Sequence, residues 1–261
     1  MKEKLCFFMF LIPILALSQD SLRNDNTGKY RISDRFSERK FYKVKESYQI
    51  DYVFLVKGDS FRVQINRDST FPHESRLVSL RDTHNSKRIV TKIIFDKEEG
   101  LFEGGDNPQK YISYHYLNDK SSEIDWDGTG IIENDTMTWI HPMRSNYFYI
   151  TQFNPFPYIK FPIKKNKTWN WDLTIHSKGD PKWRQWSEDT LVNSYTYKII
   201  RRYKSTIDNN NCNCWVIKGV ASNKVASTEL LSHYCEKLGF IKYEYLNIDG
   251  SKLIMNIRKI R

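Results

Sequence analysis

The chain has 261 residues, 39% of them hydrophobic and 15% aromatic, and its formal net charge is +10. A chain of this length can bury the core of one large domain or of two small ones. Beyond the N-terminal segment, no apolar run approaches the about 20 residues that a membrane-spanning helix needs. We therefore expect no transmembrane span in the mature protein.

The N-terminal segment has the pattern of a secretory signal peptide. Two lysines near the start precede an uncharged apolar run over residues 5–17. Ala16 and Ser18 then supply the small residues that a signal-peptide cleavage site needs. We expect a signal peptide over 1–18 and a mature protein that is secreted or periplasmic.

The positive charge predicts anionic partners. Outside the cytoplasm these are lipids, lipopolysaccharide or acidic glycans, and we expect no nucleic-acid partner. Charge that serves only solubility is the alternative. Lysine and arginine are dispersed along the chain, with their densest clusters at 160–167, 201–204 and 258–261. A protein partner in the cell envelope is a further expectation.

A polar leader over 19–46 shows little periodicity, and a regular pattern begins at residue 47. Apolar residues then alternate with polar ones on both sides of Lys57-Gly58-Asp59, which predicts a β-hairpin over 47–65. Further strands are predicted at 87–95, 110–117, 136–140 and 146–151.

The second half of the chain carries the clearest alternation. In TWNWDLTIH, Trp169 and Trp171 alternate with polar residues and so share one face of a predicted strand. Asp249-Gly250 lies between two alternating runs and predicts a hairpin over 240–260, because a type I′ turn needs positive φ at both central residues. The other predicted strands cover 195–203, 214–220 and 227–235.

This succession of about a dozen strands without an amphipathic helix predicts an all-β fold. Alternating strands joined by short turns favour an antiparallel sheet with one wetted face. A large curved sheet, an open barrel and a sandwich all satisfy the pattern. We expect a β domain over 47–261. The proline-rich part of 152–167 is either a linker across the sheet or a seam between two halves.

Tryptophan is the residue type that points most directly to a binding surface. An aromatic row on a concave sheet can stack on sugar rings or line a pocket for acyl chains, although the same row also fills the core of a β domain. Two histidines lie beside these aromatic residues, and a hydrogen-bonded structural histidine is the alternative for each. The predicted ligand-binding residues are Trp139, Trp169, Trp171, Trp183, Trp186, His141 and His176.

The segment DWDGTGIIENDT partly matches a calcium-binding loop. Asp125, Asp127 and Thr129 occupy the first, third and fifth positions, but Thr136 stands where the bidentate acid belongs. These three residues are a weak metal-site candidate. We favour an Asp/Gly-rich turn between two strands at this place, and we expect no cofactor.

Three cysteines follow the signal segment: Cys212, Cys214 and Cys235. An oxidising compartment favours one disulfide and one remaining thiol. We expect the pair Cys214–Cys235, with Cys212 as the alternative partner of Cys235. The absence of a bridge, and metal or redox chemistry, stay open as alternatives.

The sequence contains no nucleophile elbow, metalloprotease motif, P-loop or dinucleotide-binding motif. We therefore predict no catalytic residue. The expected function is the binding of an apolar or glycan envelope ligand without catalysis. One alternative is a glycan hydrolase or lyase, in which carboxylates such as Glu123, Asp125 or Asp172 meet a histidine. The other is a structural interaction module of an envelope assembly.

The second half also resembles a family of secreted bacterial envelope proteins of unknown function. The resemblance covers residues 136–257 and lies in three segments: TWIHPMRSNYFYITQFNPFPYIKFP, TWNWDL and CWVIKGVASNKVASTELLSHYCEKLGFIKYEYLNIDGS. The sheets of that family are distantly similar to the half-barrels of Lol-type lipoprotein carriers. The resemblance implies an extracytoplasmic, curved antiparallel sheet with a cavity for an apolar ligand, and it implies no catalytic residues.

Overall fold

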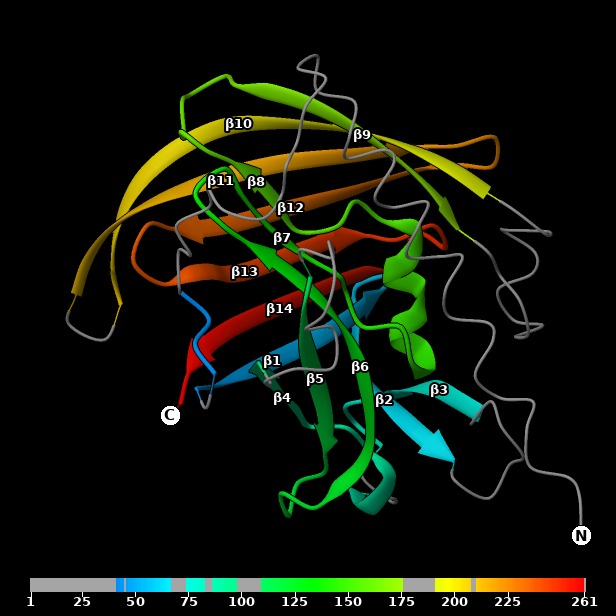
Figure 1. Ribbon diagram of the computed structural model, residues 1–261. Helices are drawn as coiled ribbons and strands as arrows, with labels where there is room; N and C mark the ends of the chain where they lie inside the picture. The colour runs from blue at the N-terminus through cyan, green and yellow to red at the C-terminus, as the bar shows by residue number, and fades with distance from the viewer. Residues whose placement is uncertain are drawn as a thin grey trace, which may run out of the picture.

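The computed structural model describes residues 41–44, 46–66, 74–82, 86–97, 109–175, 191–207 and 210–260. In this part of the chain the fold is all-β and built on one curved antiparallel sheet, which confirms the predicted fold class (Figure 1). The elements are β1 (Ser47–Val56), β2 (Asp59–Asn66), β3 (Glu74–Ser79), η1 (Ser86–Arg88), β4 (Lys92–Lys97), β5 (Lys110–Leu117), β6 (Glu123–Glu133), β7 (Met137–Ile140), η2 (Asn146–Phe153), β8 (Tyr158–Lys160), β9 (Thr168–Ile175), β10 (Leu191–Ile207), β11 (Asn210–Ser222), β12 (Ser227–Cys235), β13 (Gly239–Leu246) and β14 (Lys252–Lys259). No helix in these ranges is long and apolar enough to cross a membrane.

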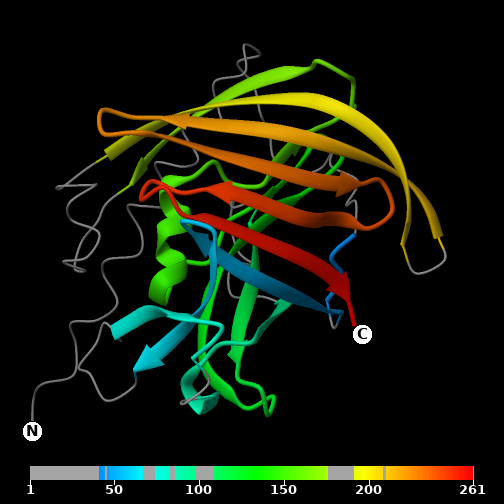
Figure 2. The ribbon, with the colours of Figure 1, turned by 180° about the vertical axis from the view of Figure 1, so that it is seen from behind.

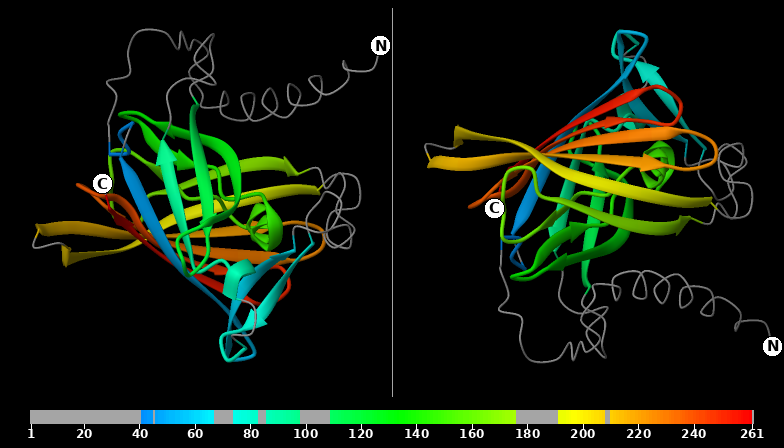
Figure 3. Two further views of the ribbon diagram at one scale, coloured as in Figure 1. Left: turned by 90° about the horizontal axis from the view of Figure 1, so that it is seen from below. Right: turned by 90° about the horizontal axis from the view of Figure 1, so that it is seen from above.

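Twelve strands follow one path through the sheet, in the order β8-β7-β6-β5-β4-β1-β14-β13-β12-β11-β10-β9. β2 pairs with β1 and with β3, off this path. The sheet curls until its two ends approach each other, and the ring of Tyr158 in β8 lies 5.7 Å from that of Trp169 in β9. The result is a nearly closed barrel, seen from opposite sides in Figures 1 and 2 and from below and above in Figure 3.

Side chains alternate between the inner and outer faces of the barrel with the period of two that a strand imposes. In β10, buried and exposed side chains alternate from Leu191 to Ile200. A register shift between Ile199 and Arg201 ends this pattern, and β10 continues beyond the last residue that pairs with β9. The first part of β10 therefore supplies the core, and its second part supplies exposed polar and basic side chains.

The segment 146–151 is not a strand, and this prediction was wrong. Asn146–Phe153 forms the 3₁₀ helix η2 instead. The side chain of Phe148 packs against the inner face of the sheet, stacked on Tyr116 at 5.4 Å. A segment inside a barrel has no free strand edge to pair with. Its backbone N–H and C=O groups must therefore find hydrogen-bond partners within the segment or close to it. The hydroxyl of Thr151 does part of this by donating to the carbonyl oxygen of Phe148.

The strand predicted over 87–95 begins later than expected, because the chain first contacts β2. Ser86–Arg88 forms the short 3₁₀ helix η1, and β4 starts only at Lys92. Between them, the backbone N–H of Val90 donates to the carbonyl oxygen of Val63. This crossing to β2 delays the entry of the segment into the main sheet.

The proline-rich segment 154–157 lies inside the barrel and helps to fill it. The side-chain amide of Asn154 donates to the carbonyl oxygens of Glu229 and Leu246, on two different strands. A Cβ added to Gly219 would come within 2.7 Å of the ring of Pro155. The interior at this point is therefore filled by the chain itself, and a glycine in β11 makes the close approach possible.

Candidate functional site

The described tryptophans of the predicted ligand wall lie in the core. Trp139, Trp169 and Trp171 are 4%, 7% and 5% exposed. Trp139 contacts Trp171 edge-on at 5.7 Å, and Trp169 stacks on Tyr197 at 5.4 Å. In this conformation the three indoles pack against other side chains of the protein rather than facing an open concavity.

Three other residues of the predicted wall, Trp183, Trp186 and His176, lie outside the described residues. Trp126 is the described tryptophan that is exposed, at 56% of its surface, and the sequence analysis did not single it out. Its exposure could not be foreseen from alternation alone, because Trp126 shares its face of β6 with Gly128 and Gly130, whereas the buried Asp127 lies on the opposite face.

The ring of His141 is held by contacts within the fold. Its Nδ1 lies 2.8 Å from the carbonyl oxygen of Pro142, and its ring lies 4.9 Å from that of Phe156. Burial, with a smaller effect from the nearby Arg144 guanidinium, lowers the pKa of His141 to about 3. The ring is therefore neutral at physiological pH and is held by the segment that fills the barrel.

The calcium-loop candidate lies within strand β6, so the expected turn at this place was wrong and comes later, at 134–136. Asp127 Oδ2 accepts hydrogen bonds from the hydroxyl of Tyr116 and from the backbone N–H groups of Arg144 and Ser145. Burial raises the pKa of Asp127 even though these donors favour the carboxylate. This carboxyl anchors the chain before η2.

The two other residues of the calcium-loop candidate, Asp125 and Thr129, also form hydrogen bonds within the protein. Asp125 Oδ2 accepts from the side-chain amide of Asn146, and the hydroxyl of Thr129 donates to the carbonyl oxygen of His141. Within the described residues, no group of three or more His, Cys, Asp or Glu side chains could hold a metal ion.

A cleft lies at one end of the barrel, where β13 and β14 separate. The two strands pair from Leu246↔Lys252 to Lys242↔Asn256. Beyond that point β13 continues along β12, whereas β14 continues along β1. The opening has a volume of about 220 Å³ and is lined by Phe41, Lys43, Glu46, Tyr48, Ile207, Lys237, Leu238, Phe240, Ile241, Ile257, Arg258 and Lys259. We call this end of the barrel the cleft end.

The lining of the cleft divides into an apolar floor and a basic rim. The floor consists of Phe41, Tyr48, Ile207, Leu238, Phe240, Ile241 and Ile257, and the rim consists of Lys43, Lys237, Arg258 and Lys259. Glu46 is the one acidic residue of the lining, so the formal charge of the site is four minus one, or +3. An apolar floor under a basic rim is complementary to an amphiphile with an anionic head group.

Glu46 is already engaged by two cations of the rim, closely by Lys259 and more distantly by Lys43, whose Nζ lies 3.9 Å from Oε1 of Glu46. Its Oε1 lies 2.6 Å from the Nζ of Lys259, and its Oε2 accepts a hydrogen bond from the hydroxyl of Tyr48. Partial burial opposes ionisation of Glu46, but the hydrogen bonds from Lys259 and Tyr48 outweigh it and hold the pKa below its usual range. Lys237, in contrast, forms no ion pair with any described residue, and Arg258 lies 3.8 Å from the half-exposed Asp51.

One wall of the cleft is a short segment that crosses the cleft end of the barrel, residues 41–44 with Glu46, which we call the strap. The hydroxyl oxygen of Tyr42 accepts a 2.7 Å hydrogen bond from the backbone N–H of Phe240. A Cβ on Gly239, at φ +73°, would come within 2.7 Å of that hydroxyl oxygen. The strap therefore fits closely against the start of β13.

The buried carboxyl of Glu133 holds the strap from inside the barrel. Its Oε1 accepts a 2.8 Å hydrogen bond from the backbone N–H of Phe41, and its Oε2 lies 3.6 Å from the Nζ of Lys97. Burial raises the pKa of Glu133 to about 7, against the effects of that hydrogen bond and of Lys97. This carboxyl thus titrates near neutral pH.

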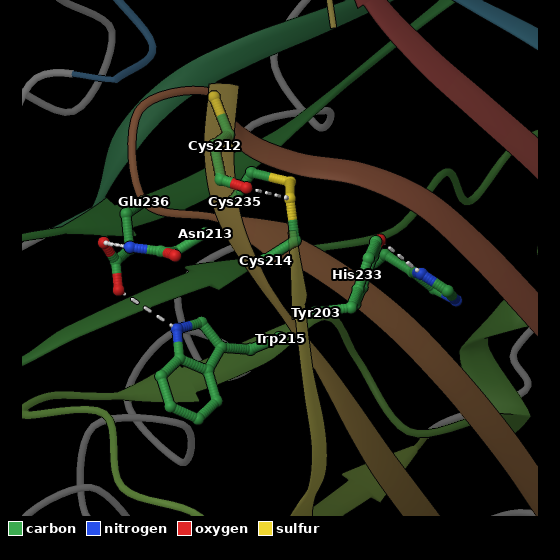
Figure 4. Close-up of a disulfide and its surroundings, with 8 residues drawn as sticks. All are labelled: Tyr203, Cys212, Asn213, Cys214, Trp215, His233, Cys235 and Glu236. Atoms are coloured by element: carbon green, nitrogen blue, oxygen red, sulfur yellow. Dashed lines mark hydrogen bonds between the residues drawn. A yellow bond between two sulfur atoms is a disulfide. The ribbon is translucent and has the colours of Figure 1, made fainter. Parts of the chain in front are cut away.

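The opposite wall contains the disulfide. Cys214 in β11 and Cys235 in β12 are directly opposite each other and are bonded, while Cys212 is a free, buried thiol (Figure 4). The cysteines pack against Tyr203, Ile207, Leu238 and Ile241. Ile207, Leu238 and Ile241 also belong to the cleft floor, so the disulfide supports the floor from behind.

Hydrogen bonds around the disulfide also hold the wall of the cleft that contains it. Glu236 accepts a hydrogen bond from the indole N–H of Trp215 at 3.2 Å and one from the side-chain amide of Asn213 at 3.4 Å. The hydroxyl of Tyr203 is hydrogen-bonded to Nδ1 of His233 at 2.9 Å. These contacts lie beside the disulfide in Figure 4. The first two tie β11 to the turn after β12, and the third ties β10 to β12.

The sequence analysis did not identify the cleft, because its lining comes from distant segments. Two signals were visible in the sequence, the basic clusters at 201–204 and 258–261. Residues 201–204 and the described part of the second cluster, 258–260, both lie at the cleft end. Their proximity depends on the pairing of β1 with β14 and of β10 with β11, which the alternation of side chains does not specify.

No protein-family model matches the chain, and no curated protein sequence matches it. Three solved structures are similar to parts of this structure, at low sequence identity. A candidate exported protein with a YmcC-like fold from Bacteroides fragilis has 7% identity and a TM-score of 0.42, over 83% of this chain and 97% of that one. A candidate lipoprotein from Parabacteroides distasonis has 10% identity and a TM-score of 0.41, over 84% and 98%. The hypothetical lipoprotein YmcC from Escherichia coli has 8% identity and a TM-score of 0.30, over 85% and 90%. The resemblance to Lol-type carriers stays a prediction.

Proposed function

We propose that the protein is a non-catalytic, extracytoplasmic binding protein whose cleft holds part of an anionic amphiphile. The observation that carries the proposal is the combination of seven floor residues, apolar or aromatic, with four rim cations in one opening between β13 and β14. The acyl chain would lie on the floor, and the acidic head group would lie at the rim. The signal peptide pattern and a disulfide support export to an oxidising compartment.

The size of the cleft limits how much of a ligand it can hold. Its volume of about 220 Å³ is below the range of about 300–1,000 Å³ that is usual for pockets enclosing a whole small molecule. The cleft would therefore take one end of an acyl chain. Four methylene groups buried there would contribute about 3 kcal/mol, at about 0.8 kcal/mol each.

The basic rim would make the cleft selective for ligands with an anionic head group over ligands with a neutral one. Lys237 and Arg258 are exposed cations that hold no short ion pair, so an anion can approach them without displacing a strong partner. Lys259 is already bonded to Glu46 and contributes less. Selectivity for an anionic head group is thus expected to depend mainly on Lys237 and Arg258.

The test is a calorimetric titration of the mature protein with dodecanoate and with dodecyl maltoside, which share an alkyl chain and differ in head-group charge. We expect dodecanoate to bind at least about tenfold more tightly, and the variant Lys237→Ser/Arg258→Ser to lose about that factor. Lys57→Asn/Lys252→Ser removes two charges from the opposite end of the barrel and serves as the control. Equal losses in both variants, or no binding of dodecanoate by the wild type, would refute the proposal.

A further inference from the structure

At the cleft end, β10 and β11 extend past the barrel as a two-stranded ribbon. β9 pairs with β10 only as far as Lys198↔Thr168, and β12 pairs with β11 only from Cys214↔Cys235. Beyond these points, residues 201–207 of β10 pair only with residues 210–216 of β11, among the strands that the structure describes. Figures 1 and 3 show this ribbon projecting beyond the other strands. We call residues 201–207 and 210–213 the ribbon.

The ribbon is held at its base. An isolated two-stranded hairpin is at best marginally stable in water. Here the disulfide Cys214–Cys235 joins the ribbon to β12, and the contact of Tyr203 with His233 adds a second link. A projecting ribbon with such support is a stable surface feature rather than a frayed end.

The strands of the ribbon carry three exposed cations and no acidic residue. Arg201 lies over the ring of Tyr203, at 5.6 Å, and Arg202 lies over that of Trp215, at 5.3 Å. Lys204 follows on the same strand. No acidic side chain of the described residues forms an ion pair with any of the three, and Asp208, in the connection between the strands, lies outside these residues.

The ribbon and the cleft form one continuous surface. Ile207, near the tip of the ribbon, is part of the cleft floor, and Lys237 of the rim follows the disulfide by two residues. Three ribbon cations therefore lie at the same end of the barrel as the four rim cations. The cleft opens within this basic surface.

We propose that the cleft end docks on an anionic membrane surface through the ribbon, so that the cleft receives its ligand directly from the bilayer. This inference rests on the proposed function of the cleft. Lysine and arginine side chains near an anionic bilayer each favour binding, and the attraction decays within the Debye length. The apolar floor favours a membrane over an acidic glycan, because a glycan offers no acyl chain to bury.

The test is flotation of the full mature chain with vesicles of phosphatidylcholine, with or without phosphatidylglycerol. The wild type should float only with the anionic vesicles, and less as the salt concentration rises. The variant Arg201→Ser/Arg202→Ser/Lys204→Ser should bind them about a hundredfold more weakly.

The matched control is Lys57→Asn/Lys120→Ser/Lys252→Ser. These three lysines lie at the other end of the barrel, as the pairing of β1 with β14 and of β4 with β5 shows. Both variants lose three positive charges, so a difference between them reports the position of the charges. The control should keep most of the wild-type flotation.

Equal loss in the two variants would overturn the docking surface, because net charge alone would then explain binding. Failure of the wild type to float, with retention on a heparin column, would also overturn it and indicate an acidic glycan. Titration with dodecanoate separates the two proposals. A wild type that binds dodecanoate but does not float would refute docking alone, and one that floats without binding dodecanoate would refute the proposed function of the cleft.

Discussion

The backbone N–H of Phe41 donates a 2.8 Å hydrogen bond to Oε1 of Glu133, a residue 92 positions later in the chain. The bond ties the strap to the inner face of β6, beneath the cleft. It is made by a carboxyl whose pKa burial raises to about 7. The attachment of the strap is therefore coupled to proton uptake near neutral pH.

The first prediction concerns that coupling. The folded protein holds the proton of Glu133 more tightly than the unfolded chain does, so this residue favours folding below pH 4.5 and loses that effect as the pH rises to about 7. The loss amounts to about 3 kcal/mol at most, at about 1.4 kcal/mol for each pKa unit. Lys97, Tyr42 and Tyr48 are the other titratable groups around it.

Glu133→Gln removes this titration while keeping an acceptor for the N–H of Phe41. Urea unfolding at pH 5 and pH 8 should show a smaller difference between the two pH values in the variant than in the wild type. Parallel pH dependence in both proteins would show that Glu133 does not titrate in this range.

His141 should act in the opposite direction. Its pKa in the folded state is about 3, below the usual 6.5, so its contribution to stability is present above pH 6.5 and is lost as the pH falls towards 3. His141→Gln should therefore reduce the acid sensitivity of the wild type between these limits, even if it lowers stability at pH 8. The check is the slope of unfolding free energy against pH, and an unchanged slope contradicts the assignment.

Trp171 and Trp126 should differ sharply in their contributions to stability. Trp171 is 5% exposed and contacts Trp139 and Phe156, whereas Trp126 is 56% exposed. Trp171→Ala should cost about 3–5 kcal/mol because it leaves a cavity in the core. Trp126→Ala is the matched control and should change the unfolding free energy little. Similar losses for both would mean that Trp171 is not a core residue.

The disulfide should stabilise the protein by restricting the unfolded chain between Cys214 and Cys235. Its partners are 21 residues apart, which corresponds to about 3 kcal/mol in the chain-entropy model. Cys235→Ser should lower the unfolding free energy by about that amount under oxidising conditions. Cys212→Ser keeps the bridge and serves as the control. If reductant lowers the stability of Cys235→Ser as much as that of the wild type, the bridge is not the cause.

Much of the fold could be predicted from alternation and turns. The hairpin at Lys57-Gly58 forms as expected, with positive φ at both residues. The hairpin over 240–260 also forms, but its last strand pair is Leu246↔Lys252 and Asp249 lacks the positive φ of a type I′ turn, so the predicted turn type was wrong. The helix η2 could not be predicted in this way. Its aromatic and β-branched residues favour strands, and only its position inside a barrel without a free strand edge makes a helix the better solution.

The candidate site was harder to predict than the fold, because the cleft depends on which strands pair and on where their pairing ends. Alternation placed Trp169 and Trp171 on one face but did not say whether that face is covered. The segment that covers it, 154–157, is proline-rich and lacks any periodicity that points inward. Charge clusters at 201–204 and 258–261 were visible from the start, but their joint surface required the register of β1, β14, β10 and β11.

The proposed function places an acyl chain on the floor between β13 and β14. The most direct measurement is a crystal structure of the mature protein with dodecanoate that carries a bromine at the end of its chain, located by anomalous scattering. We expect one bromine peak against Phe240 and Ile241, with the carboxylate near Lys237 and Arg258. A bromine peak in another part of the molecule, or an empty cleft at saturating ligand, would contradict it.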